Sequence, residues 1–214
     1  MGTIDLRLAT ELRDELGLKR AIETGTYRGL TARALAPVFG SVVTIELSRQ
    51  VHERAARALG DLPNVEPIQG DSREVLAGIA RAEMPTLYFL DGHWSGGATG
   101  GVGDECPLLG ELAAIGSGHP QDCLVIDDAR LFTSAPPPPH DPAQWPTITE
   151  VFDAIRSERP GHSVTLIDDQ VLAVPRRAKP VIDAYGARAY ERSADLPTRI
   201  RGTLWQAANR IRRR

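Results

Sequence analysis

Acidic residues recur along the chain at the ends of short apolar runs. They are Glu23, Glu46, Asp71, Asp91 and the Asp127-Asp128 pair. If these runs are parallel strands, their carboxyl ends meet at one edge of a sheet, where ligands of α/β folds bind. A row of carboxylates at that edge suits a ligand that carries amino groups, hydroxyl groups or a metal ion. Acids scattered over a surface would not follow strand ends in this way.

Two glycines come soon after Glu23, at Gly25 and Gly29, and a helical pattern follows them. This order predicts a strand, a tight turn and a helix, the arrangement that holds nucleotide-like cofactors. The spacing is Gly-x-x-x-Gly, not the Gly-x-Gly-x-x-Gly of dinucleotide folds, and Glu23 would repel a pyrophosphate. An ordinary strand–helix connection is the alternative, and the motif alone does not decide between them. The residues expected to bind a cofactor here are Glu23, Thr24, Gly25, Thr26, Tyr27 and Gly29.

Glu46 lies about twenty residues beyond the glycine turn, the spacing of an acid that accepts hydrogen bonds from ribose hydroxyls. Ser48 follows it and is expected to begin the next helix beside the cofactor. The alternative for Glu46 is a helix-start acid that interacts with the helix dipole. We favour the ribose interpretation because Glu46 and the glycine turn support each other.

Asp127 and Asp128 are adjacent at the end of one expected strand, and Asp91 ends another. Neighbouring carboxylates repel each other unless a cation or hydrogen-bond donors neutralise them. Oxygen ligands of this kind suit Mg²⁺, which retains water and can admit substrate oxygens. We therefore expect Asp91, Asp127 and Asp128 to bind the metal. The alternative is a set of turn acids satisfied by backbone N–H groups.

His93 stands two residues after Asp91. An imidazole titrates near neutral pH, so His93 is the first candidate for a general base and Asp91 is the second. A metal ion would share this task by lowering the pKa of an acceptor hydroxyl. The alternative is a loop histidine that bonds the backbone or contacts the cofactor, and both interpretations remain open.

The strands and helices that must position these residues alternate along a chain of 214 residues. The chain carries a formal net charge of −3 and two cysteines. This composition favours neither a nucleic-acid partner nor a disulfide framework. The N-terminus lacks a signal-peptide pattern, and no apolar run reaches transmembrane length. A cytoplasmic protein is therefore expected.

Apolar and β-branched runs predict strands, and helical patterns lie between them. The expected strands are Lys19–Glu23, Ser41–Leu47, Val65–Gln69, Thr86–Leu90 and Cys123–Ile126. The expected helices are Ile4–Leu16, Leu30–Phe39, Arg49–Leu59, Ser72–Ala80, Pro107–Ile115 and Ile148–Arg156. Two further runs, Ser163–Ile167 and Gln170–Val174, flank Asp168-Asp169 and predict a closing hairpin. Together they predict an α/β fold with a mostly parallel seven-stranded sheet and a terminal antiparallel hairpin.

Five parallel strands followed by a hairpin, with an acid after each strand, resemble the Rossmann-like class I S-adenosylmethionine-dependent methyltransferases. The Asp-Asp pair resembles that of metal-dependent O-methyltransferases of the catechol and macrocin-like sugar types. More narrowly, the chain resembles the small enzymes that cap methylmannose polysaccharides. The resemblance spans about residues 19–174 and does not reach the tail.

The resemblance implies S-adenosylmethionine as cofactor, Mg²⁺ at the acids and methyl transfer to a hydroxyl of a small molecule or glycan, with a sugar as first choice. It also implies that Asp71 and Ser72 contact adenine, although Asp71 as a plain helix cap is nearly as good an interpretation. Two other classes stay open. They are a nicotinamide-dependent oxidoreductase, which the Gly-x-x-x-Gly turn disfavours, and a non-catalytic Rossmann-like binding module.

Two loops and a tail surround this predicted domain of residues 1–180. Trp94 and Trp145 lie in the loops that would border the acceptor, where they stack on it or only cover the loops. Residues 181–214 form a basic extension with an apolar helical stripe that includes Ile200, Leu204 and Ile211. We expect this helix to dock on the core or to form a homodimer, while binding to an anionic partner or a membrane surface is the alternative.

Overall fold

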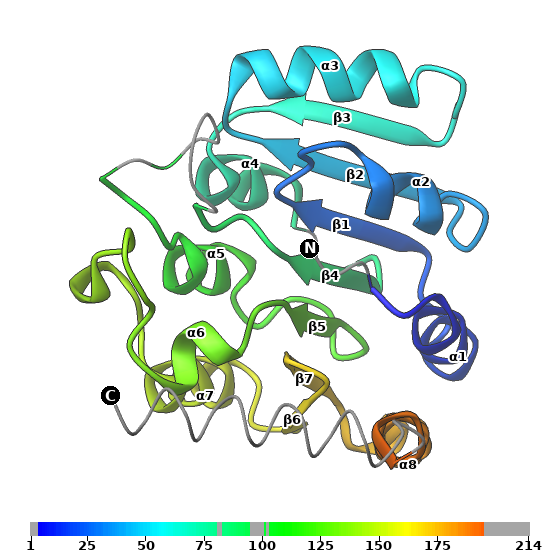
Figure 1. The fold of residues 1–214 in the computed structure, drawn as a ribbon. Coiled ribbons are helices and arrows are strands. Elements are labelled where there is room, and N and C mark those ends of the chain that lie inside the picture. Colours follow the sequence, from blue (N-terminus) through cyan, green and yellow to red (C-terminus); the bar gives the residue numbers. More distant parts are fainter. Residues whose placement is uncertain (1–3, 81–82, 95–100, 102, 195–214) are drawn as a thin grey trace.

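The computed structural model describes residues 4–80, 83–94, 101 and 103–194, and its centre is one seven-stranded sheet (Figure 1). The strands are β1 Arg20–Thr24, β2 Ser41–Glu46, β3 Val65–Gln69, β4 Thr86–Leu90, β5 Cys123–Ile126, β6 His162–Ile167 and β7 Gln170–Pro175. Their order is β3-β2-β1-β4-β5-β7-β6. The first five strands are parallel, and β7 runs antiparallel to both β5 and β6. The predicted fold class is confirmed.

Helices cover both faces of the sheet. They are α1 Leu6–Leu16, α2 Leu30–Leu35, α3 Arg49–Leu59, α4 Ser72–Ile79, α5 Leu108–Ile115, α6 Arg130–Thr133, α7 Ile148–Glu158 and α8 Lys179–Ala194, with 3₁₀ turns η1 Pro142–Gln144 and η2 Arg176–Ala178. One hydrophobic cluster joins the sheet to α1, α2 and α8, and a second joins it to α4, α5, α6 and α7. This three-layer arrangement leaves the carboxyl ends of the strands open at one edge.

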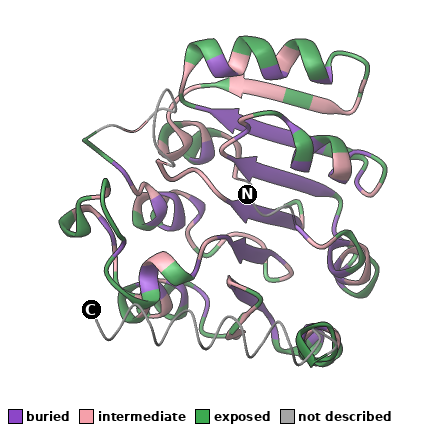
Figure 2. Ribbon diagram, viewed as in Figure 1, coloured by how far each residue is buried: buried purple, intermediate pink, exposed green. Residues whose placement is uncertain are grey.

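Strands β1 and β4 are both buried along their whole length (Figure 2). This burial explains the nearly continuous apolar sequence of β4, whereas β1 also buries Arg20, Glu23 and Thr24. Side chains alternate between the two layers, as the period of a strand requires. Ala21 and Phe89 lie in the first cluster, whereas Ile22 and Tyr88 lie in the second.

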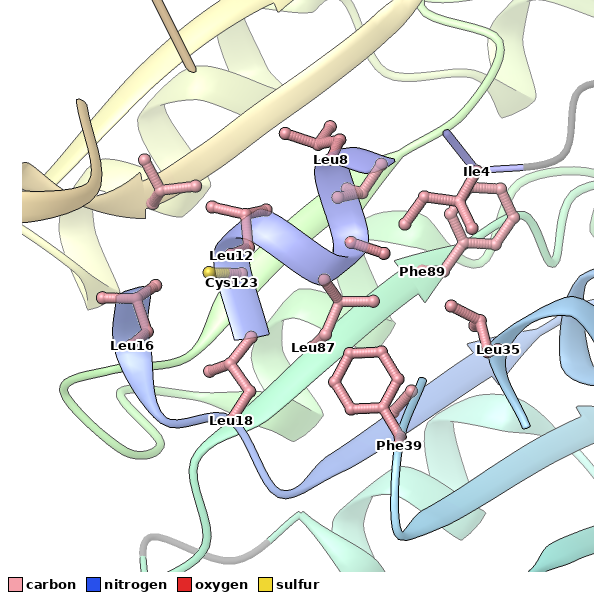
Figure 3. Close-up of a cluster of buried hydrophobic side chains, with 14 of the residues drawn as sticks. Ile4, Leu8, Leu12, Leu16, Leu18, Leu35, Phe39, Leu87, Phe89 and Cys123 are labelled. Atoms are coloured by element: carbon pink, nitrogen blue, oxygen red, sulfur yellow. The ribbon is translucent and has the colours of Figure 1, made fainter. Parts of the chain in front are cut away.

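Helix α1 closes one face through an apolar stripe. Asp5 caps its start by accepting from the backbone N–H groups of Arg7 and Leu8, and Gly17 ends it with a φ of 67°. The buried side chains of this stripe are Leu8, Leu12 and Leu16, seen within the first cluster in Figure 3.

Helix α8 packs beside α1 and crosses the predicted domain boundary at residue 180. Its Ile182 and Tyr185 belong to the first cluster, and Arg188 pairs with Glu11 of α1 at 2.7 Å. The apolar stripe predicted from Ile200 to Ile211 lies outside the described residues, so homodimerisation through it stays a prediction. Within the described part of the chain, no helix is long and apolar enough to cross a membrane.

One expected helix was wrong in its extent. Helix α2 ends at Leu35, whereas the sequence predicted a helix to Phe39. Pro37 explains the difference, because its ring lacks an N–H donor and crowds the preceding turn. The short α6 and the 3₁₀ turns were not predicted, since their apolar patterns are too brief to show a period.

Candidate functional site

A cleft lies at the carboxyl edge of the sheet, where the loops after β1, β2, β3, β4 and β5 meet. As it stands, it encloses a cavity of about 110 Å³. Among the residues predicted to bind the cofactor, those that line it are Gly25, Tyr27, Glu46, Asp71, Ser72 and Asp91. His93, Asp127 and Asp128 line it as well. The remaining predicted residues, which do not line it, are Glu23, Thr24, Thr26, Gly29 and Ser48.

The glycine turn is pressed against neighbouring elements. Gly25 has a φ of 82°, and a Cβ there would stand 2.1 Å from the carbonyl oxygen of Asp91. Gly29 has a φ of 70°, and a Cβ there would stand 2.9 Å from Leu59. Both positions therefore need glycine for conformation and for space. This close approach brings the end of β1 directly beside the end of β4.

Glu46 joins the glycine turn to the loop after β2. Its carboxylate accepts from the backbone N–H groups of Tyr27 at 3.0 Å and Ser48 at 2.9 Å. A carboxylate has room for further donors. Glu46 therefore holds the wall of the cleft and can still accept from a ligand hydroxyl.

Glu23 supports the turn from behind. It is fully buried, and its Oε2 lies 2.6 Å from Thr44 Oγ1, which in turn lies 2.7 Å from Thr26 Oγ1. Burial raises the pKa of Glu23 to about 8. Thr24 plays a similar part, because its hydroxyl accepts from the backbone N–H of Asp91 at 3.2 Å.

Asp71 is held by Arg73, a residue that no sequence pattern marks as part of the site. Its carboxylate accepts from the backbone N–H of Arg73 and from the guanidinium of the same residue at 2.6 and 2.9 Å. Hydrogen bonding to Arg73 lowers the pKa of Asp71. Arg73 also pairs with Asp104 at 2.7 Å, so the start of α4 is tied to the loop after β4. No local pattern marks this contact, since Asp104 lies in a glycine-rich loop.

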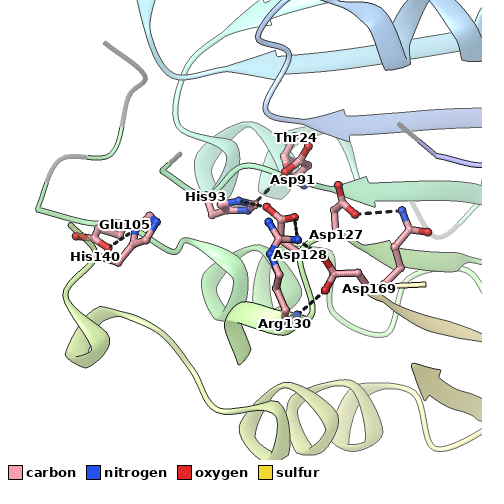
Figure 4. A network of polar contacts seen from close by, with 10 residues as sticks. Thr24, Asp91, His93, Glu105, Asp127, Asp128, Arg130, His140 and Asp169 are labelled. Carbon is pink, nitrogen blue, oxygen red and sulfur yellow. Dashed lines mark hydrogen bonds and ion pairs between the residues drawn. The ribbon is translucent and has the colours of Figure 1, made fainter. Parts of the chain in front are cut away.

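His93 stands between two carboxylates (Figure 4). Its Nε2 lies 2.8 Å from Asp128 Oδ2, and its Nδ1 lies 3.5 Å from Asp91 Oδ1. Burial would lower the pKa of His93, but the bond with Asp128 and the charge of Asp91 outweigh it and raise the pKa. Burial raises the pKa of Asp91 to about 7. Ligand atoms of Asp91, His93 and Asp128 lie within 4.8 Å of one another, close enough to hold one metal ion.

Asp127 turns in another direction from Asp128. Its Oδ1 accepts from the side-chain amide of Gln170 at 3.1 Å, and its carboxyl is buried (Figure 4). Burial raises its pKa. Of the three predicted metal ligands, Asp91 and Asp128 therefore face His93, while Asp127 faces β7.

A buried carboxylate connects the two loops beside His93. Glu105 accepts from Trp145 Nε1 at 2.7 Å and from the backbone N–H of Asp141 at 3.2 Å, and it pairs with His140 at 3.1 Å. The Trp145 ring lies 5.4 Å from the His93 ring and is only 7% exposed. These contacts favour the interpretation of Trp145 as hydrophobic cover.

No known protein-family profile matches the chain, and no curated protein matches it. Solved structures do match. A proposed caffeoyl-CoA O-methyltransferase from Staphylococcus aureus is 16% identical, with a TM-score of 0.58 over 81% of this chain and 85% of that one. An O-methyltransferase from Bacillus cereus with bound S-adenosylhomocysteine is 19% identical, with a TM-score of 0.57 over 80% and 79%.

A methyltransferase from Podospora anserina, also bound to S-adenosylhomocysteine, is 18% identical, with a TM-score of 0.55 over 81% of this chain and 79% of that one. The chain has the Rossmann-like methyltransferase fold. Identities this low establish the fold alone, because one fold carries many activities. Function must therefore be argued from the site.

Proposed function

We propose that this protein transfers a methyl group from S-adenosylmethionine to a hydroxyl group of a small molecule or glycan, most simply a sugar. The main support is one juxtaposition. A cleft formed by a glycine turn and Glu46 adjoins a histidine held between Asp91 and Asp128. The first half suits a nucleoside cofactor, and the second offers a group that can accept a proton beside it.

The charge of the cleft favours this cofactor over a dinucleotide. Glu46, Asp71 and Asp91 line it, together with Arg73, which pairs with Asp71, so that carboxylates outnumber the arginine. These carboxylates attract a sulfonium and an ammonium group, whereas they repel a pyrophosphate. In the proposal, Glu46 accepts from the ribose hydroxyls while Asp71 and Ser72 meet the adenine. The other residues predicted to bind the cofactor do not line the cleft, and in the proposal they maintain the shape of the turn that binds it. They are Glu23, Thr24, Thr26, Gly29 and Ser48.

His93 is the proposed base, with Asp91 as the second candidate. Its bond to Asp128 fixes the ring, so one nitrogen is oriented while the other faces Asp91. Methyl transfer needs little more from the protein than alignment, exclusion of water and removal of one proton, because the sulfonium is already activated.

Mg²⁺ is the proposed helper. The oxygen atoms of Asp91 and Asp128 fit a hard cation, and Asp127 is the third predicted ligand. A bound divalent ion would lower the pKa of the acceptor hydroxyl. Asp91 and Asp128 would hold the ion, and His93 would take the proton.

Calorimetry with S-adenosylhomocysteine and with NAD tests the cofactor. We expect only S-adenosylhomocysteine to bind, and Glu46→Ala to weaken it by more than tenfold, since a hydrogen bond to a charged group is worth roughly 1.5–3 kcal/mol. Glu66→Ala, at an exposed position on β3, is the control and should bind normally. Binding of NAD alone would contradict the proposal.

Mass spectrometry of a sugar library incubated with isotopically labelled S-adenosylmethionine tests the reaction. Chelator should abolish turnover and Mg²⁺ should restore it, while His93→Ala should slow it by about 10²–10⁴-fold, the usual range for a general base. Full activity in excess chelator would exclude a metal ion from the mechanism, and His93 or Asp91 would then act as the base alone. Failure to label any hydroxyl would contradict O-methylation.

A further inference from the structure

A second cavity adjoins the cleft and shares Asp127 and Asp128 with it. It measures about 430 Å³, within the range of small-molecule sites. Its walls come from the segment before α1, the ends of β5 and β6, the start of β7, and α6 and α8. The other lining residues are Ile4, Asp5, Arg130, Asp168, Asp169, Gln170, Tyr185 and Arg192. A molecule held here would lie directly beside the candidate base and metal ligands.

This cavity has an excess of negative charge. Five aspartates line it, against two arginines. Both arginines are already engaged, since Arg130 pairs with Asp128 and Asp169, and Arg192 pairs with Asp168. Asp127 has no cationic partner in an ion pair among the described residues.

Gln170 has a buried acceptor without a hydrogen-bond partner among the described residues. It is 5% exposed, and its side-chain N–H donates to Asp127 Oδ1 at 3.1 Å. That bond orients the amide, so the carbonyl oxygen Oε1 faces away from Asp127. Within the described part of the chain, Oε1 has no hydrogen-bond partner. Buried polar atoms without a partner are uncommon in folded proteins, and this one calls for a donor.

The remaining walls fit the same kind of ligand. Tyr185 and Ile4 provide apolar surface beside the acids. The pKa of Tyr185 is raised to about 12, first by burial and then by the carboxylates of Asp168 and Asp5. The guanidinium of Arg192 already lies over the Tyr185 ring, with its carbon 5.7 Å from the ring centre, which shows that this wall accommodates a cationic group.

We propose that this second cavity binds a protonated amino group of the methyl acceptor, with the Gln170 carbonyl and the Asp127 carboxylate as its hydrogen-bond partners. The inference rests on the proposed function and narrows its substrate to an amine-bearing polyol such as an amino sugar. The ammonium donates to Gln170 and Asp127, while a hydroxyl of the same molecule reaches the cleft beside Asp128. An acidic acceptor is disfavoured, because its charge would meet these aspartates.

Three sugars test the charge requirement without any variant. Glucosamine carries the ammonium, N-acetylglucosamine keeps the nitrogen but loses the charge, and glucose lacks both. Binding is measured by saturation-transfer NMR with S-adenosylhomocysteine present. We expect glucosamine to bind at least about tenfold more tightly than the other two, as one charged hydrogen bond implies, and to weaken as NaCl is raised. Equal binding of the three sugars, or failure of all three to bind, would overturn the proposal.

Variants test the two partners. Gln170→Leu and Asp127→Asn should each weaken glucosamine binding by about tenfold, the cost of one hydrogen bond to a charged group. Asp183→Asn is the control, because Asp183 is exposed on α8 and pairs with Lys179 outside the cavity. Circular dichroism checks that each variant is folded, and the sugar comparison decides if one is not. Unchanged glucosamine binding in folded Gln170→Leu would overturn the assignment.

Calorimetry with S-adenosylhomocysteine separates this inference from the proposed function. Binding of the cofactor product with no preference for glucosamine refutes the amine site and leaves the methyltransferase proposal intact. Absence of cofactor binding refutes the proposed function, and the amine site is then judged on the sugar comparison in apo protein.

Discussion

The carboxyl group of Glu23 should make the stability of this protein depend on pH in a defined direction. It is completely buried beside Thr44, and burial raises its pKa to about 8 from an ordinary value of 4.5. In the folded protein the group therefore keeps its proton across the neutral range, whereas in the unfolded chain it is ionised. The folded state binds more protons, so stability falls as pH rises between these two values.

The size of the effect follows from the two pKa values. Between pH 5 and pH 8, each pH unit costs at most about 1.4 kcal/mol of unfolding free energy, because one extra proton is bound in the folded state. Over that interval the loss is on the order of 4 kcal/mol, and a chain of this length changes its Tm by about 2–4 °C per kcal/mol. Glu23→Gln replaces the neutral acid with an amide of similar shape and removes this dependence.

Urea unfolding of wild type and Glu23→Gln at pH values from 5 to 9 measures the effect, with Glu66→Gln as an exposed-carboxyl control on β3. The two proteins should be similar in stability near pH 5, and the variant should be the more stable at pH 9. Other acids titrate in both proteins, so the difference between them is the quantity to follow. A difference that does not change with pH would refute the neutral state of Glu23 in the fold.

Two further predictions concern the loops above the cleft. Asp104→Asn should speed the association of S-adenosylhomocysteine in stopped-flow experiments. The Arg73–Asp104 ion pair ties the loop after β4 to α4, beside a cavity that is smaller than a cofactor needs. An unchanged association rate would show that this ion pair does not limit entry of the cofactor. Trp145→Phe should lower the Tm and expose residues 134–147 to protease, because it keeps an aromatic ring but removes the hydrogen bond to Glu105. Trp94→Phe is the matched control, because Trp94 Nε1 has no hydrogen-bond partner among the described residues. Equal effects of the two substitutions would contradict the role of Glu105.

The sheet could be predicted because its information is local. Strands such as Thr86–Leu90 are short apolar runs. The acids that follow these runs mark the carboxyl edge of the sheet, independently of the contacts that their side chains make. The glycine turn could be predicted as well, because the close approach of the Asp91 carbonyl requires glycine at position 25 and the sequence shows that glycine directly. Strand ends therefore predicted the edge of the sheet at which the cleft lies.

The contacts within the site could not be predicted, because they join residues that no local pattern connects. Glu105 and Trp145 are 40 positions apart, and Asp127 and Gln170 are 43 apart. Arg73 was missed for the same reason, because its partner Asp104 belongs to a distant loop. The ends of helices depended on single residues such as Pro37, so a prediction from the spacing of apolar residues alone made the helix too long.

The Asp127-Asp128 pair shows that two adjacent acids at a strand end can have different surroundings. Their mutual repulsion predicted a single cation between them, since like charges at a strand end need neutralising. In the structure the two side chains turn in different directions, with Asp128 in a left-handed conformation at a φ of 57°. Asp128 pairs with His93 and Arg130, whereas Asp127 accepts from the neutral side-chain amide of Gln170 and forms no ion pair among the described residues. Asp127 is therefore turned toward β7 and Asp128 toward His93, although both line the cleft and the second cavity, and that asymmetry connects the proposed amine site to the proposed methyl-transfer site.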